Sequence, residues 1–308
     1  MSHETVGVEI EMAGLNGPAI AAVVREMLGG ELDATSEHLV TVRGTRLGDF
    51  KIKLDTRYAD AATQAPEALA RAATEMLRWT EGLLPLELTA PPLPPAELPR
   101  LDDLVTRLAR AGAVGTTGSP VAAFAVHFNP AIAATDTASL HRWLLAFALG
   151  YAWLAARVDA NATRRLVGFA TPYPEGYVEQ LATTDYDDDR DRLVDDYLAF
   201  NPTRNRALDA LPLLAHLDAA RLARALPDEP VSHRPTLHYR LPDSRIGEPG
   251  WSLGLEWRRW LAIARVAEDA IALERLRGRF VAAGVPSRSD AWKEISTPWF
   301  ESAEVGGR

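Results

Sequence analysis

The sequence predicts an α+β domain built around one mostly antiparallel sheet. Short runs with strand-like composition alternate with longer segments in which apolar residues recur at helical spacing. Two of the short runs, 38–42 and 50–54, flank a turn at Gly44, and this spacing is typical of an antiparallel hairpin. Because a hairpin pairs its strands antiparallel, an α+β domain is the simplest architecture for these elements.

The strands are expected at 6–12, 38–42, 50–54, 85–89, 121–128 and 236–241. The fourth strand runs directly into Ala90-Pro91-Pro92-Leu93. Because proline has no N–H to donate to a sheet, we expect this strand to end before Pro91. The six segments together would form the predicted sheet.

The helices are expected between these strands. Asn16-Gly17-Pro18 is typical of a helix start, and Gly29-Gly30 of the end of that helix. A further helix is expected to open within 201–209, after Pro202, where its free N–H groups would form an anion site. The remaining long helices are predicted at about 66–79, 98–111, 137–158 and 253–283.

The composition is that of a folded protein, with 47% hydrophobic and 24% charged residues. The absence of cysteine excludes disulfides and thiolate metal sites. A net charge of −9 argues against a general nucleic-acid binder, and the run from Trp143 to Ala156 is short for a membrane span. The first residues lack the pattern of a secretory signal. We therefore expect a cytoplasmic protein with no nucleic-acid and no membrane partner.

No internal repeat and no long linker divides the 308 residues. We expect a single domain over 1–308, with a core at about 5–285 and a tail at 286–308. The tail carries Trp292, Trp299 and Phe300, which would pack either on the domain or on a partner.

The first strand contains the most informative pattern, Val6-Gly7-Val8-Glu9-Ile10-Glu11-Met12. Side chains alternate along a strand, so Glu9 and Glu11 share one face while Val8 and Ile10 share the other. Two carboxylates on one face of a buried strand are costly unless a positive group lies between them. A divalent cation would fill that role. Taken alone, the pair also fits an edge strand with one solvated face.

Other polar residues lie on the predicted strands. Glu87 falls late in the fourth strand, and His127 shares a face with Asn129 at the end of the fifth. A histidine and an asparagine at a strand end can bind a metal ion or hold a phosphate. Lys53 and Asp55 lie two residues apart and form either an exposed ion pair or a paired site in a cleft.

Arginines concentrate in two later segments. Arg204 and Arg206 lie in 201–209, and alternation in the last strand places Arg234, His238 and Arg240 on one face. Guanidinium groups match phosphate geometry. Cations for phosphate and carboxylates for a metal ion are together what a site that uses a nucleotide needs. Neither a P-loop pattern nor a dinucleotide fingerprint is present.

In their order and spacing, these motifs resemble those of the amidoligases, a family related to glutamine synthetase and glutamate–cysteine ligase. The resemblance runs from about residue 5 to 265 and includes the segment 201–206 and Trp251-Ser252-Leu253. It is carried by Gly7-Val8-Glu9-Ile10-Glu11, by Glu87 before Pro91-Pro92-Leu93, by His127-Phe128-Asn129 and by Tyr239-Arg240-Leu241-Pro242.

The resemblance implies a curved antiparallel sheet with helices on its outer side, as in the catalytic domain of glutamine synthetase. It implies ATP-dependent ligation of a carboxylate to an amine, with a small-molecule or peptide substrate on each side and with Mg²⁺ or Mn²⁺ as cofactor. Glu9, Glu11 and Glu87 would match metal ligands. His127 would lie at the metal and the phosphates, and Arg240 would face the phosphates.

Two positions depart from the family pattern. Relatives usually carry Glu-x-Arg in the late strand, where this chain has His238-Tyr239-Arg240. Many relatives have a second histidine where this chain has Asn129. His238 could replace the missing acid as a ligand, although imidazole suits Mg²⁺ poorly, and Glu256 is another candidate.

Three functions follow from these residues. The first is an amidoligase, in which Lys53, Asp55, Arg204, Arg206 and Arg240 would serve catalysis, and Arg234, His127, Asn129 and Arg240 would hold ATP. The second is a phosphotransferase or hydrolase with the same carboxylates. The third is a non-catalytic relative that binds a nucleotide or a peptide.

Overall fold

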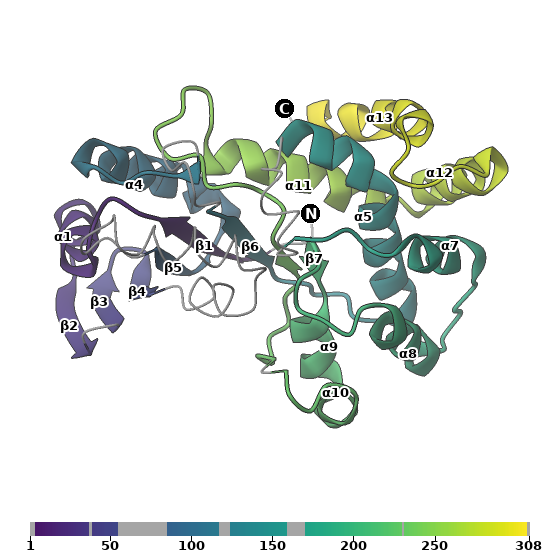
Figure 1. Ribbon diagram of the computed structural model, residues 1–308, viewed down its shortest axis with the longest axis horizontal. Coiled ribbons are helices and arrows are strands. Elements are labelled where there is room, and N and C mark those ends of the chain that lie inside the picture. The colour runs from purple at the N-terminus through teal and green to yellow at the C-terminus, as the bar shows by residue number, and fades with distance from the viewer. Residues whose placement is uncertain are drawn as a thin grey trace, which may run out of the picture.

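The computed structural model describes residues 4–36, 39–54, 85–116, 124–158, 170–229 and 231–306. It contains an eight-stranded sheet with the strand order β2-β3-β4-β5-β1-β6-β8-β7, and all neighbouring strands in it are antiparallel (Figure 1). The strands are β1 Val6–Met12, β2 Glu31–Ser36, β3 Leu39–Thr45, β4 Gly48–Leu54, β5 Leu86–Leu93, β6 Val126–Pro130, β7 Leu208–Asp209 and β8 His238–Tyr239. The predicted α+β class and antiparallel sheet are confirmed.

Two of the predicted long helices are confirmed. Helices α4 Leu98–Ala111 and α5 Thr137–Val158 have the bounds that the sequence predicts. Asn16 accepts a hydrogen bond from the Ala19 N–H and starts α1 Gly17–Leu28. The others are η1 Pro95–Glu97, α7 Glu175–Thr183, α8 Arg190–Phe200, α9 Leu211–Leu217, α10 Ala219–Ala225, α11 Leu253–Glu268, α12 Ala270–Ala283 and α13 Asp290–Val305.

The two faces of the sheet have different characters. Val8 and Ile10 of β1 are buried on the face that points toward the helices, together with Leu88, Phe128 and Tyr239 of the neighbouring strands. Because side chains alternate along each strand, the charged residues of the same strands lie on the opposite face. One face therefore belongs to the core, and the other can hold a site.

Aromatic side chains lock the helices onto strands β6 and β8. On α11, the ring of Trp257 lies 5.7 Å from Phe128 and the ring of Trp260 lies 5.2 Å from Tyr239. Phe147 of α5 approaches Tyr239 edge-on at 6.1 Å. Buried aromatic contacts of this kind add packing energy and restrict ring orientation. They hold the short strand β8 in register beside β6.

Strand β5 corrects the prediction that the chain leaves the sheet at Pro91. It continues to Leu93, which pairs with Val6 of β1 across a register shift. Strand β4 pairs with β5 only as far as Thr89, so the two prolines lie where β5 has a single neighbour. On the side of β5 that has no paired strand, the missing N–H of proline costs the sheet no hydrogen bond. Strand β2 was not among the predicted strands.

Two helix predictions were wrong. Residues 201–207 form a loop between α8 and β7, because the chain there returns to the sheet through Leu208 and Asp209. The long helix predicted at 253–283 is two helices, since the Asp269 side chain accepts from the Ala272 N–H and starts α12. The helix predicted at 66–79 and residues 121–123 of the fifth strand lie outside the described residues.

The C-terminal segment packs on the domain. The Trp292 indole N–H of α13 donates to the Leu149 carbonyl of α5 at 2.9 Å. Phe300 stacks on Trp153 of α5 with ring centroids 5.3 Å apart. Both contacts lie within the core, and Figure 1 shows α13 lying against α5 and α11. Of the two alternatives for this tail, the structure shows the contact with the domain.

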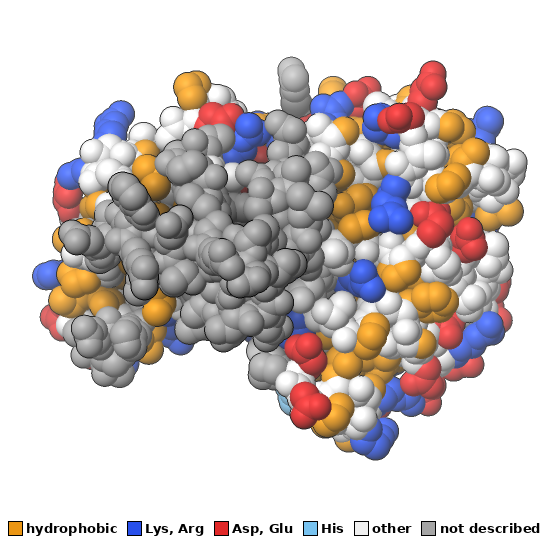
Figure 2. Space-filling model, in the orientation of Figure 1, with side chains coloured by type: hydrophobic (Ala, Val, Ile, Leu, Met, Phe, Trp, Pro, Cys, Tyr) orange, Lys and Arg blue, Asp and Glu red, His pale blue; other side chains and the backbone are white. Residues whose placement is uncertain are grey.

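Charges are mixed on the helical part of the face drawn in Figure 2, where acidic and basic side chains alternate and neither sign forms a continuous area. Within the described ranges, no helix combines the length and apolar character that crossing a bilayer requires.

The contact of α5 with α11 and α13 depends on Gly150. A Cβ atom at this position would lie 2.5 Å from Ile263 Cδ1 and 2.7 Å from Phe300 Cζ. We expect Gly150→Ala to lower the free energy of unfolding by about 1–3 kcal/mol, because overpacking forces these helices apart. Urea unfolding followed by circular dichroism measures the change.

Gly278 of α12 provides the matched control. A Cβ atom there meets nothing within 4 Å. Gly278→Ala should raise the free energy of unfolding by up to about 1 kcal/mol, because alanine favours the helix. Equal effects of the two substitutions would contradict the close approach of α5 to its neighbours.

Candidate functional site

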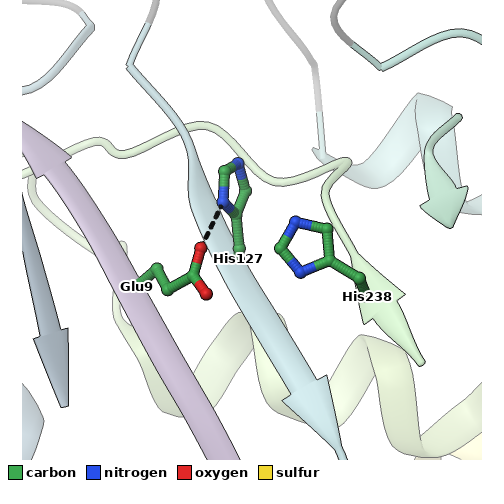
Figure 3. A group of neighbouring side chains, drawn as sticks. All are labelled: Glu9, His127 and His238. Carbon is green, nitrogen blue, oxygen red and sulfur yellow. Dashed lines mark hydrogen bonds and ion pairs between the residues drawn. The ribbon is translucent and has the colours of Figure 1, made fainter. Parts of the chain in front are cut away.

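Three adjacent strands bring Glu9, His127 and His238 together on the polar face of the sheet (Figure 3). Glu9 of β1 pairs in register with His127 of β6. Tyr239 pairs with Phe128, so His238 of β8 comes to the same face as His127. One ligand atom from each of the three side chains lies within 4.8 Å of the other two. One carboxylate and two imidazoles at these distances could hold a metal ion.

Asn129 links two members of this group. Its Nδ2 amide group donates to Glu9 Oε1 at 3.1 Å, and its Oδ1 atom lies 2.7 Å from His238 Nδ1. Glu9 ionised can only accept, which fixes the orientation of the amide. The amide oxygen likewise can only accept, so the proton of His238 is on Nδ1 and its Nε2 carries the lone pair.

His127 lies between the two glutamates of β1. Its Nδ1 is 3.0 Å from Glu9 Oε2, and its Nε2 is 3.5 Å from Glu11 Oε1. Glu11 also accepts from the Ala125 backbone N–H at 2.8 Å. These contacts explain how a strand can bury two carboxylates on one face: polar groups of β6 approach both of them.

Glu87 lies on the next strand and extends the acidic part of the site. It pairs in register with Glu11 on one side and with Lys53 of β4 on the other. Lys53 Nζ is 3.0 Å from Glu87 Oε1, and the Thr89 hydroxyl donates to the same oxygen at 2.8 Å. The structure therefore brings Lys53 to the predicted carboxylates. Asp55, its predicted companion, lies outside the described residues.

The predicted arginines differ in whether they reach the polar face of the sheet. Arg234 Nη1 lies 3.9 Å from Glu9 Oε1, so this half-exposed guanidinium borders the metal-binding group. Arg240 is buried on the same face as His238, and its Nη1 donates to the Arg204 carbonyl. Arg206 does not join them: its guanidinium donates to Thr171 Oγ1 and to the Pro172 and Phe200 carbonyls at 3.0–3.1 Å. Arg206 thus holds the loop at 201–207 in shape.

A family model described as "Putative amidoligase enzyme" matches residues 2–262. This chain belongs to that family. The matched part includes every strand of the sheet and all the site residues described above. A comparison with curated proteins finds no match.

The two positions at which the sequence departs from the pattern that the resemblance implies are in direct contact. His238 and Asn129 form the 2.7 Å hydrogen bond described above. Burial, opposed by the charge of Glu9, holds the pKa of His238 well below its usual range. The imidazole is therefore neutral at pH 7, as a metal ligand must be.

Glu256, the other candidate for the missing acid, serves a different purpose. It lies on α11, where Oε1 accepts from the Arg259 guanidinium at 2.6 Å. Burial raises the pKa of its carboxyl group against this favourable charge. Its position on a helix of the core gives it a structural ion pair.

Asp209 is a site residue that sequence reasoning missed. It pairs in register with His238, is fully buried, and has Oδ2 3.9 Å from Arg204 Nε. Its Oδ1 accepts from the Leu211 N–H at 2.9 Å. The sequence placed it in the opening turns of an expected helix, and only the pairing of β7 with β8 brings it to the polar face.

Burial raises the pKa of Asp209 from 3.8 to about 6, although Arg240 and Arg204 favour its charged form. A raised pKa means that the folded state holds the proton more tightly than the unfolded state. The contribution of Asp209 to stability is therefore greatest below pH 3.8 and is lost as the pH rises through about 6. A rise of about two units corresponds to at most about 3 kcal/mol.

We expect Asp209→Asn to remove this pH dependence, because asparagine keeps the acceptor for Leu211 but does not titrate. The stability of the variant relative to wild type should rise by about 2–3 kcal/mol between pH 4 and pH 8. Urea unfolding at several pH values measures it, with Asp228→Asn at an exposed position as the control for loss of one charge. If the stability difference between the variant and wild type stays constant from pH 4 to pH 8, the pKa of Asp209 is not raised.

Proposed function

We propose that this protein is an ATP-dependent carboxylate–amine ligase that forms an amide or isopeptide bond. The observation that carries the proposal is the polar face of the sheet, where Glu9, Glu11 and Glu87 lie beside His127, His238 and Arg240. Membership of the amidoligase family supports the same reaction class.

The proposed reaction has two steps. The substrate carboxylate attacks the γ-phosphorus of ATP, which breaks the bond to ADP and forms an acyl phosphate. The amine then attacks the acyl carbon, phosphate leaves, and the amine loses a proton. The first step depends on charge neutralisation and alignment more than on covalent help from the protein.

The acidic residues would hold Mg²⁺ or Mn²⁺, which neutralises phosphate charge when bound. Two groups of donors are available. Glu11 and Glu87 offer oxygen atoms, which suit either ion, and Glu9, His127 and His238, which converge within 4.8 Å, include two nitrogen donors that suit Mn²⁺ better. Each of these side chains is fixed by strand pairing, so the donors are preorganised before any ion arrives.

The basic residues would hold the anionic groups. Arg234, next to Glu9 and half-exposed, is the arginine that we propose for the transferred phosphate. Arg240 directly follows β8, and its guanidinium contacts Arg204 of the loop at 201–207. These two arginines would hold phosphate oxygens of ATP together with Asn129 and His127. Lys53, half-exposed beside Glu87, would orient the substrate carboxylate. The substrates are a small-molecule or peptide carboxylate and an amine.

Incubation with ATP, Mg²⁺ or Mn²⁺ and a pool of carboxylates and amines tests the proposal. We expect ADP release that requires an added amine, together with a product whose mass equals the two substrates less one water. Phosphate release without amine would instead indicate a phosphotransferase or hydrolase with the same carboxylates. Nucleotide binding without turnover would indicate a non-catalytic relative. Either of these results would overturn the ligase.

Glu9→Gln and Glu11→Gln should each reduce amine-dependent ADP release by at least about 100-fold. Glutamine keeps the shape and an acceptor oxygen but lacks the negative charge that would bind the cation. The variants should melt no lower than wild type in the absence of metal, because removing one of two neighbouring like charges relieves repulsion. ATP with Mg²⁺ should stabilise wild type alone.

Glu274→Gln, at an exposed glutamate of α12, is the control for a change in net charge. It should keep both turnover and stabilisation by nucleotide. If Glu9→Gln and Glu11→Gln behave like this control, the two carboxylates do not bind the cation and the proposed site is wrong.

A further inference from the structure

The group formed by Glu9, His127 and His238 has an unusual donor set for a site that uses ATP. Two of its three donors are imidazole nitrogens, from His127 of β6 and His238 of β8. Mg²⁺ prefers six oxygen ligands in octahedral geometry and keeps several waters. Imidazole suits first-row transition metals better, with affinity rising from Mn²⁺ through Co²⁺. The nitrogen donors therefore disfavour Mg²⁺ at this position.

The second observation is that both ends of this group are oriented by one side chain. Asn129 donates to Glu9 and accepts from His238 Nδ1 at 2.7 Å, which leaves His238 Nε2 with its lone pair. Figure 3 shows the His238 ring directed toward His127 and Glu9. Metal-binding histidines commonly donate their other ring N–H to such a partner, which fixes their tautomer and orientation.

The third observation concerns burial. His127 and His238 are buried, and the Glu9 side chain is 12% exposed. The side chains are therefore held in place by the strands and by packing, and they are not a chance meeting of surface groups. His127 Nδ1 is already 3.0 Å from Glu9 Oε2, so a cation would replace the hydrogen that these two atoms share.

We propose that Glu9, His127 and His238 form a three-ligand site for a first-row transition metal ion of the Mn²⁺, Co²⁺ and Zn²⁺ class, which binds in preference to Mg²⁺, and that Asn129 is its positioning residue. The inference deepens the proposed function, on which its relevance to ATP chemistry rests. The binding itself requires neither ATP nor the second substrate. The imidazole of His238, held by its contact with Asn129, is then the origin of the metal preference.

The experiment measures metal binding to chelator-treated protein without nucleotide. Isothermal titration calorimetry compares Mg²⁺, Mn²⁺ and Co²⁺, and the visible absorption of bound Co²⁺ reports nitrogen ligation. We expect one Co²⁺ per chain and an affinity for Mn²⁺ and Co²⁺ at least tenfold above that for Mg²⁺. Equal affinities for Mg²⁺ and Mn²⁺ in wild type would overturn the proposal without any variant.

Variants test the ligands and the positioning residue. His238→Glu should lower Co²⁺ affinity and narrow the preference over Mg²⁺ by at least tenfold, because an oxygen donor replaces nitrogen. Asn129→Ala should weaken Co²⁺ binding by about 10–100-fold while retaining its stoichiometry. His216→Gln, at an exposed histidine of α9, is the control and should bind as wild type does. Circular dichroism of the metal-free variants checks that they fold.

Different experimental results would contradict the metal site and the proposed ligase function. Tight Co²⁺ binding that His238→Glu weakens, without amine-dependent ADP release, would support the metal site and overturn the proposed function. Amine-dependent turnover, together with Co²⁺ binding that His238→Glu leaves unchanged, would support the ligase and overturn the metal site.

Discussion

The alternation of side chains along β1, β6 and β8 is the constraint on which the rest of the structure depends. In each strand, the residues that point one way belong to the core and those that point the other way are polar or charged. Register cannot slip by one residue without burying Glu9 and His127 among the helices and exposing Val8 and Phe128. The same strand register therefore fixes both the packing of the core and the set of residues in the site.

The core in turn stabilises the site at its weakest element. Strand β8 has two residues, too few to hold its register by backbone pairing alone. Tyr239 is held between Phe128, Trp260 and Phe147, and this fixes the direction of His238 and Arg240 on either side of it. The aromatic contacts on one face thus determine which polar groups meet on the other.

The polar face contains more charge than a buried surface normally tolerates, and its hydrogen bonds show how this is accommodated. Glu9, Glu11 and Glu87 each accept from a donor of a neighbouring strand or of their own. Asp209 meets Arg204 and the Leu211 N–H, yet its pKa still rises to about 6. Preorganised charge of this kind is characteristic of sites that bind charged ligands, because the protein meets the cost of burial during folding.

Much of this could be read from the sequence, because the relevant patterns are local. The bounds of α4 and α5 follow from helical periodicity, and the shared face of Glu9 and Glu11 follows from a period of two. The predictions failed where contacts between segments far apart in the sequence determine the local structure. Pro91 and Pro92 remain in β5 because the pairing of β4 with β5 stops at Lys51 and Thr89, and 201–207 is a loop because β7 must reach β8. The sequence does not distinguish Arg206 from the arginines of the site. In the structure its guanidinium donates to three oxygen atoms of neighbouring residues, two backbone carbonyls and one hydroxyl.

The sequence by itself therefore determined which residues carry chemistry and which of them share a face within each strand. Only the tertiary structure decided which of these faces meet. The strand order places β6 between β1 and β8, so that Asn129 lies between Glu9 and His238, and it adds Asp209 to the same face. The physical reason is that alternation is a property of one strand, whereas strand order and register are set by the packing of side chains far apart in the chain.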